Sequence, residues 1–247
     1  MRKLRDPGKV IDFIRTWIER VVSSSGAGGA VLGMSGGIDS AVCAALLKQA
    51  LGADRVVTVM MPCHSLALDE EHARLAADAL GVKMLTLDLS QVYDGYCRSL
   101  ETIVKPSDIA AANIKPRLRM ITLYALAQTL GYLVCGTGNK DELTVGYFTK
   151  YGDGGCDFMP LADLTKGEVW AVARRLHIPQ VLIDKAPSAG LWEGQTDEKE
   201  MGLTYAALDA YVSGEPLDEK CRREIERRKK ASEHKRTLPP ACIIGDI

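Results

Sequence analysis

The sequence predicts an α/β fold in which helices flank a doubly wound, mainly parallel sheet. Four short apolar runs have the length and composition of buried strands, and they lie at residues 30–32, 55–61, 82–87 and 132–135. Helical patterns separate these runs, and strands that alternate with helices join in parallel through crossover connections. The chain has 247 residues, 47% of them hydrophobic, so we expect a single domain over residues 1–247.

Composition excludes several classes of protein. The formal net charge of -1 predicts no general affinity for nucleic acid or for an anionic membrane surface. The seven cysteines are scattered and never form a C-x-x-C pair, which predicts reduced thiols without a zinc site or a disulfide framework. The N-terminus lacks the apolar core of a signal peptide, and no run has the length of a membrane span. We therefore expect a soluble cytoplasmic protein.

Helices of the first half form the layers that cover the sheet. Apolar residues at helical spacing predict an amphipathic helix over residues 9–22, and the run 41–48 predicts a second helix after the first strand. Further helices are expected at 69–80, where Gly81 ends the helix, and at 90–104.

The helix predicted over residues 114–130 is different, because apolar side chains surround it. Asn113 is expected to cap its N-terminus, and Pro116 is tolerated only within its first turn. Such a helix is either central in the domain or part of a subunit interface, and the pattern leaves both alternatives open.

Three more helices are expected after the last strand. Thr165 and Glu168 have the spacing of a capping box, and Lys166 stands in the first helical turn, where the helix dipole disfavours a cation. A lysine tolerated there indicates an anion nearby. The segments 203–212 and 218–235 are also helical, and the second has the mixed charge of a solvated helix.

Residues 33–40 form a glycine-rich turn between the first strand and a helix N-terminus. The N–H groups of a first helical turn hold phosphate oxygens, and glycines allow the backbone to approach them closely. A Walker A loop would carry a lysine after its last glycine, whereas Ile38, Asp39 and Ser40 follow here. A carboxylate beside phosphate is tolerated when a divalent cation lies between them, so Asp39 predicts Mg²⁺.

Three further segments are candidates for the same site. Residues 136–142 follow the fourth strand and share a sheet edge with residues 33–40, so Glu142 either shares the metal with Asp39 or is a solvated surface carboxylate. Four glycines among aromatic and charged residues make 146–157 a loop that is mobile or ordered by a ligand. The irregular segment 185–198 has a composition suited to a flap over a site.

The pattern Ser-Gly-Gly-x-Asp-Ser at 35–40 resembles the pyrophosphate-binding loop of the ATP pyrophosphatase (PP-loop) superfamily. Its members cleave ATP to AMP and pyrophosphate while they activate a substrate as an adenylate. Over nearly its whole length the chain is similar to the ammonia-dependent NAD synthetases. Motifs that coincide with theirs in order lie at 113–120, 136–142, 146–155, 185–192 and 234–236. The resemblance implies an adenine-nucleotide alpha-hydrolase-like, Rossmann-like fold.

This resemblance implies an amidation in two steps. The carboxylate of nicotinate adenine dinucleotide (deamido-NAD) attacks the α-phosphorus of ATP, which gives an acyl-adenylate and pyrophosphate, and ammonia then displaces AMP. By the resemblance, Asp39 and Glu142 hold Mg²⁺, Asp39 and Lys166 take part in catalysis, and Asp153 lies in the ammonia pocket. The residues implied to bind ATP are Gly33, Met34, Ser35, Gly36, Gly37, Ile38, Asp39, Ser40, Thr137, Lys166 and Ser188. Those implied to bind deamido-NAD are Arg117, Lys150, Asp157, His234 and Lys235.

The resemblance also implies a homodimer with its substrate site near the subunit interface. Pro116 departs from the family, in which many members have a small residue there, and this alters how the helix begins. Free ammonia is the expected nitrogen source, because the synthetase motifs account for residues 1–247. A separate glutaminase is an alternative. Other interpretations are a different PP-loop enzyme, either another adenylating amide ligase or a tRNA-modifying thiolase, and an ATP-binding module without turnover.

Overall fold

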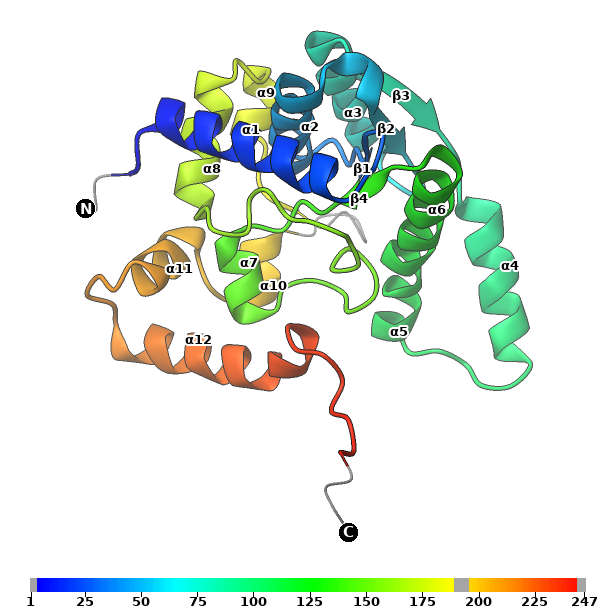
Figure 1. Ribbon diagram of the computed structural model, residues 1–247. Coiled ribbons are helices and arrows are strands. Elements are labelled where there is room, and N and C mark those ends of the chain that lie inside the picture. The colour runs from blue at the N-terminus through cyan, green and yellow to red at the C-terminus, as the bar shows by residue number, and fades with distance from the viewer. Residues whose placement is uncertain (1–3, 189–195, 244–247) are drawn as a thin grey trace.

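A central parallel sheet organises the protein, with helices on both of its faces (Figure 1). The computed structural model describes residues 4–188 and 196–243. Within them the sheet has 4 strands in the order β3-β2-β1-β4. The strands are β1 (Ala30–Gly33), β2 (Val56–Met60), β3 (Lys83–Thr86) and β4 (Leu133–Cys135). They coincide with the four predicted runs, so the prediction of an α/β fold with a parallel sheet is confirmed.

Strand β1 occupies the position at which the strand order reverses. It pairs in parallel with β2 through Ala30 and Val56, and with β4 through Ala30 and Leu133. The connection after β1 therefore runs toward β2, whereas β4 is added on the opposite side. In sheets of this type, ligands bind beyond the carboxyl ends of the strands at such a reversal.

Two layers of helices bury the two faces of the sheet. One face is covered by α1 (Pro7–Ser24), α2 (Ile38–Leu51), α3 (Ala67–Leu80) and α8 (Lys166–Arg175). The other face is covered by α4 (Ser90–Glu101) and α6 (Ile114–Leu130). Side chains of β1 alternate between these layers, since Leu32 belongs to the first core and Val31 to the second.

A third apolar cluster lies beyond the sheet edge, among the helices at the lower left of Figure 1. It is built from α7 (Lys140–Val145), α10 (Asp197–Met201), α11 (Tyr205–Val212) and α12 (Glu219–Ala231). Tyr205, Leu208 and Ile225 are its most deeply buried members. This cluster brings α7, which follows β4, into contact with the C-terminal helices.

The predicted helices are present, with ends that differ by a few residues. Short helices without a predicted counterpart are α5 (Asp108–Ala112), α7, α9 (Gln180–Asp184), α10 and η1 (Ala53–Arg55), whereas η2 (Glu233–Lys235) forms the end of the predicted helix 218–235. These elements are too short to display a helical period. The irregular flap predicted at 185–198 is partly wrong, because α10 begins at Asp197; residues 189–195 lie outside the described residues.

The prediction that Asn113 caps α6 is right in position, since Asn113 directly precedes the helix, but wrong about the capping hydrogen bond. Asn113 has φ -74° and ψ -7°, and its side chain makes no capping hydrogen bond. Instead its Oδ1 accepts a hydrogen bond from the hydroxyl of Thr149 at 2.6 Å. The reason is that α5 runs directly into α6, which leaves Asn113 in a helical conformation without the extended backbone of an N-cap.

Helix α6 packs on the sheet with one side and is exposed on the other, and its place in a subunit interface stays a prediction. Its inner side packs on the sheet, where Ala127 is buried, whereas Ile121 is 58% exposed and Leu130 is 45% exposed. No helix in the described part of the chain is long and apolar enough to cross a membrane.

Candidate active site

The glycine loop, residues 33–40, links the carboxyl end of β1 to the first turn of α2. Gly36 adopts φ 74°, and a Cβ at this position would lie 2.2 Å from the carbonyl oxygen of Asp69. The hydroxyl of Ser40 donates to the carbonyl of Gly37 at 2.9 Å and accepts from the backbone N–H of Ser35 at 3.3 Å. These contacts give the loop a fixed shape, with the N-terminal N–H groups of α2 at the reversal of the sheet.

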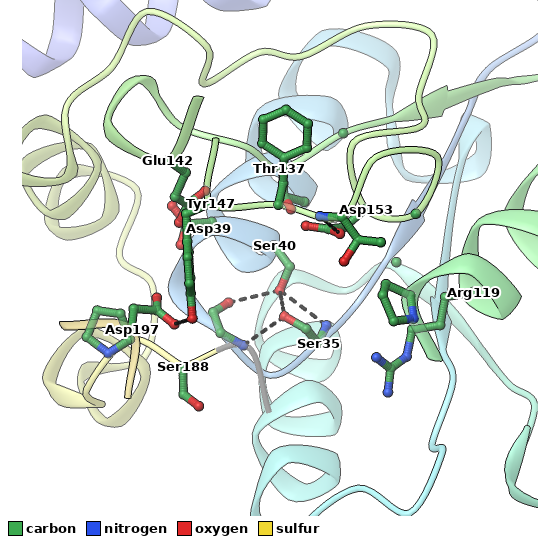
Figure 2. Close-up of a pocket in the computed structure, with 18 of the residues that line it drawn as sticks. Ser35, Asp39, Ser40, Arg119, Thr137, Glu142, Tyr147, Asp153, Ser188 and Asp197 are labelled. Carbon is green, nitrogen blue, oxygen red and sulfur yellow. Dashed lines mark hydrogen bonds between the residues drawn. The ribbon is translucent and has the colours of Figure 1, made fainter. Parts of the chain in front are cut away.

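A cavity of about 520 Å³ opens beside this loop. Its walls are formed by the glycine loop, the ends of β2 and β4, the 146–155 loop, the segment 185–188 and α10. Figure 2 shows Asp39, Glu142 and Asp197 on one side, Arg119 on the other, and Ser35 between them. The volume lies within the range usual for small-molecule sites.

Lys166 is the electrostatic centre of the acidic side. Its side chain is 1% exposed, and its Nζ lies 2.5 Å from Oδ2 of Asp39 and 3.8 Å from Oε1 of Glu142. Burial alone would lower the pKa of Lys166, but the two carboxylates outweigh it and raise the pKa. The anion expected near Lys166 is therefore present, and it consists of Asp39 and Glu142.

Asn139 holds both of these carboxylates in place. Its Nδ2 donates to Oδ1 of Asp39 at 3.2 Å, while its Oδ1 accepts from the backbone N–H of Glu142 at 3.1 Å. The backbone N–H of Asn139 in turn donates to Oε2 of Glu142 at 3.2 Å, which completes a capping box for α7. Glu142 is therefore a fixed cavity residue, and the alternative of a solvated surface carboxylate is wrong.

Tyr205 connects a third carboxylate to this centre. Its hydroxyl lies 2.9 Å from Oδ2 of Asp197 and 3.2 Å from Oε1 of Glu142. A phenol has one proton to donate, so a second proton is needed for both contacts to be hydrogen bonds. The phenol can therefore donate to only one of these two carboxyl groups at a time. Burial and then the charge of Asp39 raise the pKa of Glu142 to about 8. Three carboxyl groups around one ammonium leave this wall rich in negative charge.

We call the side of the cavity formed by Asp39, Glu142 and Asp197 the acidic wall. Its chemistry fits a divalent cation that binds together with a nucleotide. No group of three or more His, Cys, Asp or Glu side chains in the described residues could hold a metal ion by itself. Asp39 and Glu142 offer two hard oxygen ligands, both at the cavity wall. Mg²⁺ is usually held by one or two carboxylates together with substrate phosphates and water. The donor set therefore suits Mg²⁺ bound to phosphate.

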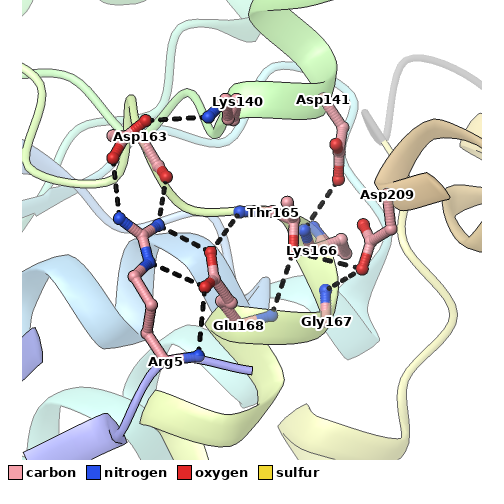
Figure 3. Close-up of polar contacts among 9 residues, drawn as sticks. All are labelled: Arg5, Lys140, Asp141, Asp163, Thr165, Lys166, Gly167, Glu168 and Asp209. Carbon is pink, nitrogen blue, oxygen red and sulfur yellow. Dashed lines mark hydrogen bonds and ion pairs between the residues drawn. The ribbon is translucent and has the colours of Figure 1, made fainter. Parts of the chain in front are cut away.

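The backbone N–H groups at the start of α8 fix the position of Lys166 (Figure 3). The N–H of Lys166 donates to Asp141 Oδ2 at 2.7 Å, and that of Gly167 donates to Asp209 Oδ2 at 3.1 Å. The predicted capping box of Thr165 and Glu168 is confirmed. The guanidinium of Arg5 contacts Oε2 of Glu168 at 2.6 Å, so the N-terminal segment is tied to the same helix end.

Four basic residues lie around the 146–155 loop: Arg117, Lys150, His234 and Lys235. Arg117 donates to the carbonyl of Lys150 at 3.3 Å, and Nζ of Lys150 donates to the carbonyl of His234 at 2.5 Å. The ammonium of Lys235 donates to two carbonyls of the loop, one of them that of Phe148 at 2.6 Å. We call Arg117, Lys150, His234 and Lys235 the basic rim; of these, Lys235 lines the cavity.

The other predicted residues divide into two groups. Thr137, Asp153 and Ser188 line the cavity with the glycine loop, and Asp153 accepts a hydrogen bond from the N–H of Thr149 at 2.8 Å. Asp157 lies apart from the basic rim. Its Oδ2 accepts from the backbone N–H of Val134 at 2.7 Å, so in this structure its carboxylate holds the end of β4.

Three cations of the cavity, Lys185, Arg119 and Arg228, were not among the predicted site residues. Nζ of Lys185 donates to the carbonyl of Gly36 at 3.0 Å and to Oδ1 of Asp69 at 2.6 Å, which joins the segment 185–188 to the glycine loop. Arg119 extends from α6, and its Nε donates to the carbonyl of Met61 at 3.1 Å. The sequence contained the motifs that hold Lys185 and Arg119, but no pattern in it placed any of the three side chains in the cavity.

The comparisons with known proteins agree with this geometry. A family model described as NAD synthase matches residues 10–239. An NH(3)-dependent NAD(+) synthetase of Carboxydothermus hydrogenoformans is 46% identical over 235 residues, which cover 92% of this chain and 94% of the relative.

Solved structures have the same fold. The structure of an NMN synthetase from Francisella tularensis has a TM-score of 0.93 and 34% identity, and the match covers 97% of this chain and 100% of that chain. An NH3-dependent NAD synthetase from Campylobacter jejuni has a TM-score of 0.82 and 27% identity, with 97% and 100% covered.

Proposed function

The chain belongs to the NAD synthase family, and we propose that it forms NAD from nicotinate adenine dinucleotide, ammonia and ATP, with release of AMP and pyrophosphate. The observation that supports this most strongly is the acidic centre of Asp39, Glu142 and Lys166 beside the glycine loop. A loop that binds phosphate by its N–H groups, with carboxylates in place of a Walker lysine, suits attack at the α-phosphorus of Mg²⁺-ATP.

In the first step a carboxylate oxygen of the substrate forms a bond to the α-phosphorus, and the bond from that phosphorus to the pyrophosphate oxygen breaks. The glycine loop, Thr137 and Ser188 bind the phosphates, and Lys166 stabilises negative charge from beneath the loop. Asp39 and Glu142 would hold Mg²⁺, which neutralises charge on the triphosphate. Lys166 keeps these two carboxylates in position before ATP binds.

In the second step ammonia attacks the acyl carbon, and AMP leaves with the oxygen that came from the carboxylate. Ammonium must first lose a proton. Asp153 is the proposed acceptor group, because its carboxylate lines the cavity in the 146–155 loop. The basic rim lies around the same loop and is suited to the two phosphates of the dinucleotide.

The proposed assembly is a homodimer in the cytoplasm. Large apolar side chains remain exposed on neighbouring helices: Ile121 of α6, Ile109 of α5, and Val92 and Tyr96 of α4. Large apolar side chains exposed on adjacent helices are typical of subunit interfaces. The seven cysteines are free thiols, which is typical of a reducing compartment.

The similarity to an NMN synthetase favours a second candidate function. That function is the same amidation performed on nicotinate mononucleotide. Both substrates present a nicotinate carboxylate to the α-phosphorus, and they differ in whether an AMP moiety extends beyond the first phosphate. The basic rim, which could contact a second phosphate, favours the dinucleotide as the first candidate.

A substrate panel separates these candidates. Purified protein with Mg²⁺-ATP is supplied with either nicotinate nucleotide and with either ammonium chloride or glutamine, and the amide products and AMP are quantified by chromatography. We expect NAD and AMP in equal amounts from the dinucleotide with ammonium. A higher kcat/KM for the mononucleotide would establish the second candidate, and equal turnover with glutamine would contradict the use of free ammonia. Folded protein that makes neither amide would refute both.

A further inference from the structure

Two cations of the cavity form no ion pair with the residues that the structure describes. Five cationic side chains line the cavity: Arg119, Lys166, Lys185, Arg228 and Lys235. Three of them form ion pairs, since Lys166 contacts Asp39, Lys185 contacts Asp69 and Arg228 contacts Glu224.

The remaining two cations differ in how many of their N–H groups are used. The ammonium of Lys235 donates to the carbonyls of Gly146 and Phe148, and it lies 5.3 Å from the ring of Phe148. Arg119 donates through Nε to the carbonyl of Met61 and through one terminal nitrogen to the hydroxyl of Ser65 at 3.3 Å. A guanidinium has five N–H groups, so most of those on Arg119 remain available, and no carboxylate among the described residues pairs with it.

Arg119 lies between the two ends of the cavity. Burial lowers the pKa of the Arg119 guanidinium, and the nearby groups that oppose this are Cys63, then Asp153 in the 146–155 loop and Asp69, whose carboxylate binds Lys185 beside the glycine loop. Figure 2 shows Arg119 across the cavity from Asp39 and Glu142, with the serines of the glycine loop between them. Its guanidinium therefore faces the region where a nucleotide phosphate and an acceptor carboxylate would meet.

An uncompensated guanidinium in a partly buried wall is costly unless an anion binds it. The proposed reaction brings two anions together, because a carboxylate must approach the negatively charged α-phosphate. Mg²⁺ held by Asp39 and Glu142 would neutralise the triphosphate from the acidic wall. A cation on the opposite wall can contact the acceptor carboxylate as well as the α-phosphate.

We propose that Arg119 is a further catalytic residue, whose guanidinium binds the acceptor carboxylate and a non-bridging oxygen of the α-phosphate during adenylation. This inference rests on the proposed function. The carboxylate oxygen forms the new bond to phosphorus, the electron pair of the breaking bond leaves with pyrophosphate, and no proton moves. Arg119 stabilises the oxygens on which charge accumulates, and its planar fork suits two oxygen acceptors.

The test uses the full-length protein and measures adenylation separately from amide formation. Exchange of labelled pyrophosphate into ATP, dependent on the nicotinate substrate and without ammonia, reports the first step. We expect Arg119→Ala to lower the kcat of exchange by about 100- to 1,000-fold, as removal of one charge-stabilising donor does in other enzymes. The KM for ATP should change much less, because the glycine loop is intact.

Guanidinium chloride added at low, non-denaturing concentration should restore part of the exchange activity of Arg119→Ala, and Arg119→Lys should retain part of it. A merely structural arginine would show neither effect. Arg174→Met is the matched control, since this arginine is exposed on α8 far from the cavity lining, and it should exchange like the unsubstituted protein.

Exchange by Arg119→Ala within threefold of the control would overturn this proposal. A loss that neither guanidinium nor lysine relieves would also overturn it. Failure of the unsubstituted protein to form amide, while it still exchanges pyrophosphate, would refute the proposed function and leave the role of Arg119 in adenylation standing. If the unsubstituted protein shows no exchange, both proposals are wrong.

Discussion

Lys166 places an ammonium beside the glycine loop, where we propose that it replaces the lysine of a Walker A loop, but it reaches the loop from a different helix. Its ammonium is buried against Asp39, which stands in the glycine loop near the position of a Walker lysine. The ion pair of Asp39 and Lys166 brings a negative and a positive charge together at the loop. We propose that this charge balance allows a carboxylate to lie beside bound phosphate.

The substitution Asp39→Asn tests the metal-binding role. The amide preserves the shape and the contact with Asn139, and Glu142 remains near Lys166, so the fold should be intact. We expect the rate of pyrophosphate release to fall by at least about 100-fold, since one ligand and one charge are lost. Circular dichroism checks the fold. Asp54→Asn, an exposed position in η1, is the control, and near-normal activity of Asp39→Asn would remove this carboxylate from the mechanism.

The buried carboxyl group of Glu142 predicts a pH dependence of stability. Burial raises its pKa from 4.5 to about 8, so the folded protein keeps a proton that the unfolded chain has lost. The unfolded state therefore binds fewer protons in this interval, and the free energy of unfolding should fall as the pH rises through it. Urea unfolding without Mg²⁺ measures this slope. Burial raises the pKa of Asp141 as well, so Glu142→Gln should reduce the slope without abolishing it. An unchanged slope would contradict the assignment.

The sequence predicted the site residues that belong to a recognisable local motif. It did not predict those whose position depends on contacts with segments far away in the chain. Asp39 follows a recognisable turn, and the position of Lys166 in a first helical turn indicated a nearby anion, which the structure contains. Arg119 lies two residues from Arg117 on one helix, and only the packing of α6 decides that Arg119 lines the cavity while Arg117 is exposed. Asp197 depends on Tyr205, which comes from another helix.

At the scale of elements, the glycine loop depends on its contact with the start of α3. Gly36 combines a positive φ of 74° with a Cβ direction blocked at 2.2 Å by backbone of Asp69. Lys185 strengthens the same junction, because it binds both the carbonyl of Gly36 and the side chain of Asp69. The loop, α3 and the segment 185–188 thus form one unit.

The substitution Gly36→Ala tests this junction against a control with the same backbone strain. Gly26 has a φ of 73° and no atom within 4 Å of a Cβ built on it. Gly26→Ala should cost about 1–2 kcal/mol, the usual penalty of a left-handed conformation. Gly36→Ala should cost more and should also weaken ATP binding, because the loop must move away from α3. Calorimetry and urea unfolding provide the two measurements, and equal behaviour of the variants would show that the contact with Asp69 is unimportant.

Long elements were predictable and short ones were not. The strands lie in continuous, mainly apolar runs, and the helices α1, α2, α3 and α8 are long enough to show apolar residues at helical spacing. Both patterns can be recognised in the sequence. Helix α7 has 6 residues, and only the spacing of Asn139 and Glu142 could have indicated it, as a capping box. Helix α10 is held by contacts of its first residue, Asp197, with two tyrosines from other segments.

At the scale of the whole molecule, the reversal of strand order at β1 explains why distant segments share one cavity. The glycine loop follows β1, and the 136–142 segment follows the neighbouring β4, so the two lie side by side at one sheet edge. The C-terminal helices close the acidic side through Tyr205 and Asp197. Parallel topology was predictable from the order of the runs, whereas the docking of α11 and α12 depends on contacts far apart in sequence.

The proposed dimer predicts a response to a charge on the exposed side of α6. Ile121→Glu would place a carboxylate in the apolar interface, so the dissociation constant of the dimer should rise at least about tenfold. Sedimentation over a range of protein concentrations measures it. Phe13→Glu on α1, where Phe13 is 68% exposed on the opposite layer, should leave the dimer unchanged. A monomer at all concentrations, or equal effects of the two variants, would contradict an interface formed by α6.

We propose that this chain activates a nicotinate carboxylate by joining it to the α-phosphate of ATP. Oxygen-18 in the carboxylate of nicotinate adenine dinucleotide follows this bond directly, because the oxygen that attacks phosphorus leaves with the nucleotide. With unlabelled Mg²⁺-ATP and ammonium, mass spectrometry should find one labelled oxygen in each AMP formed and none in pyrophosphate. Unlabelled AMP, or label recovered in inorganic phosphate with ADP as the nucleotide product, would contradict the account.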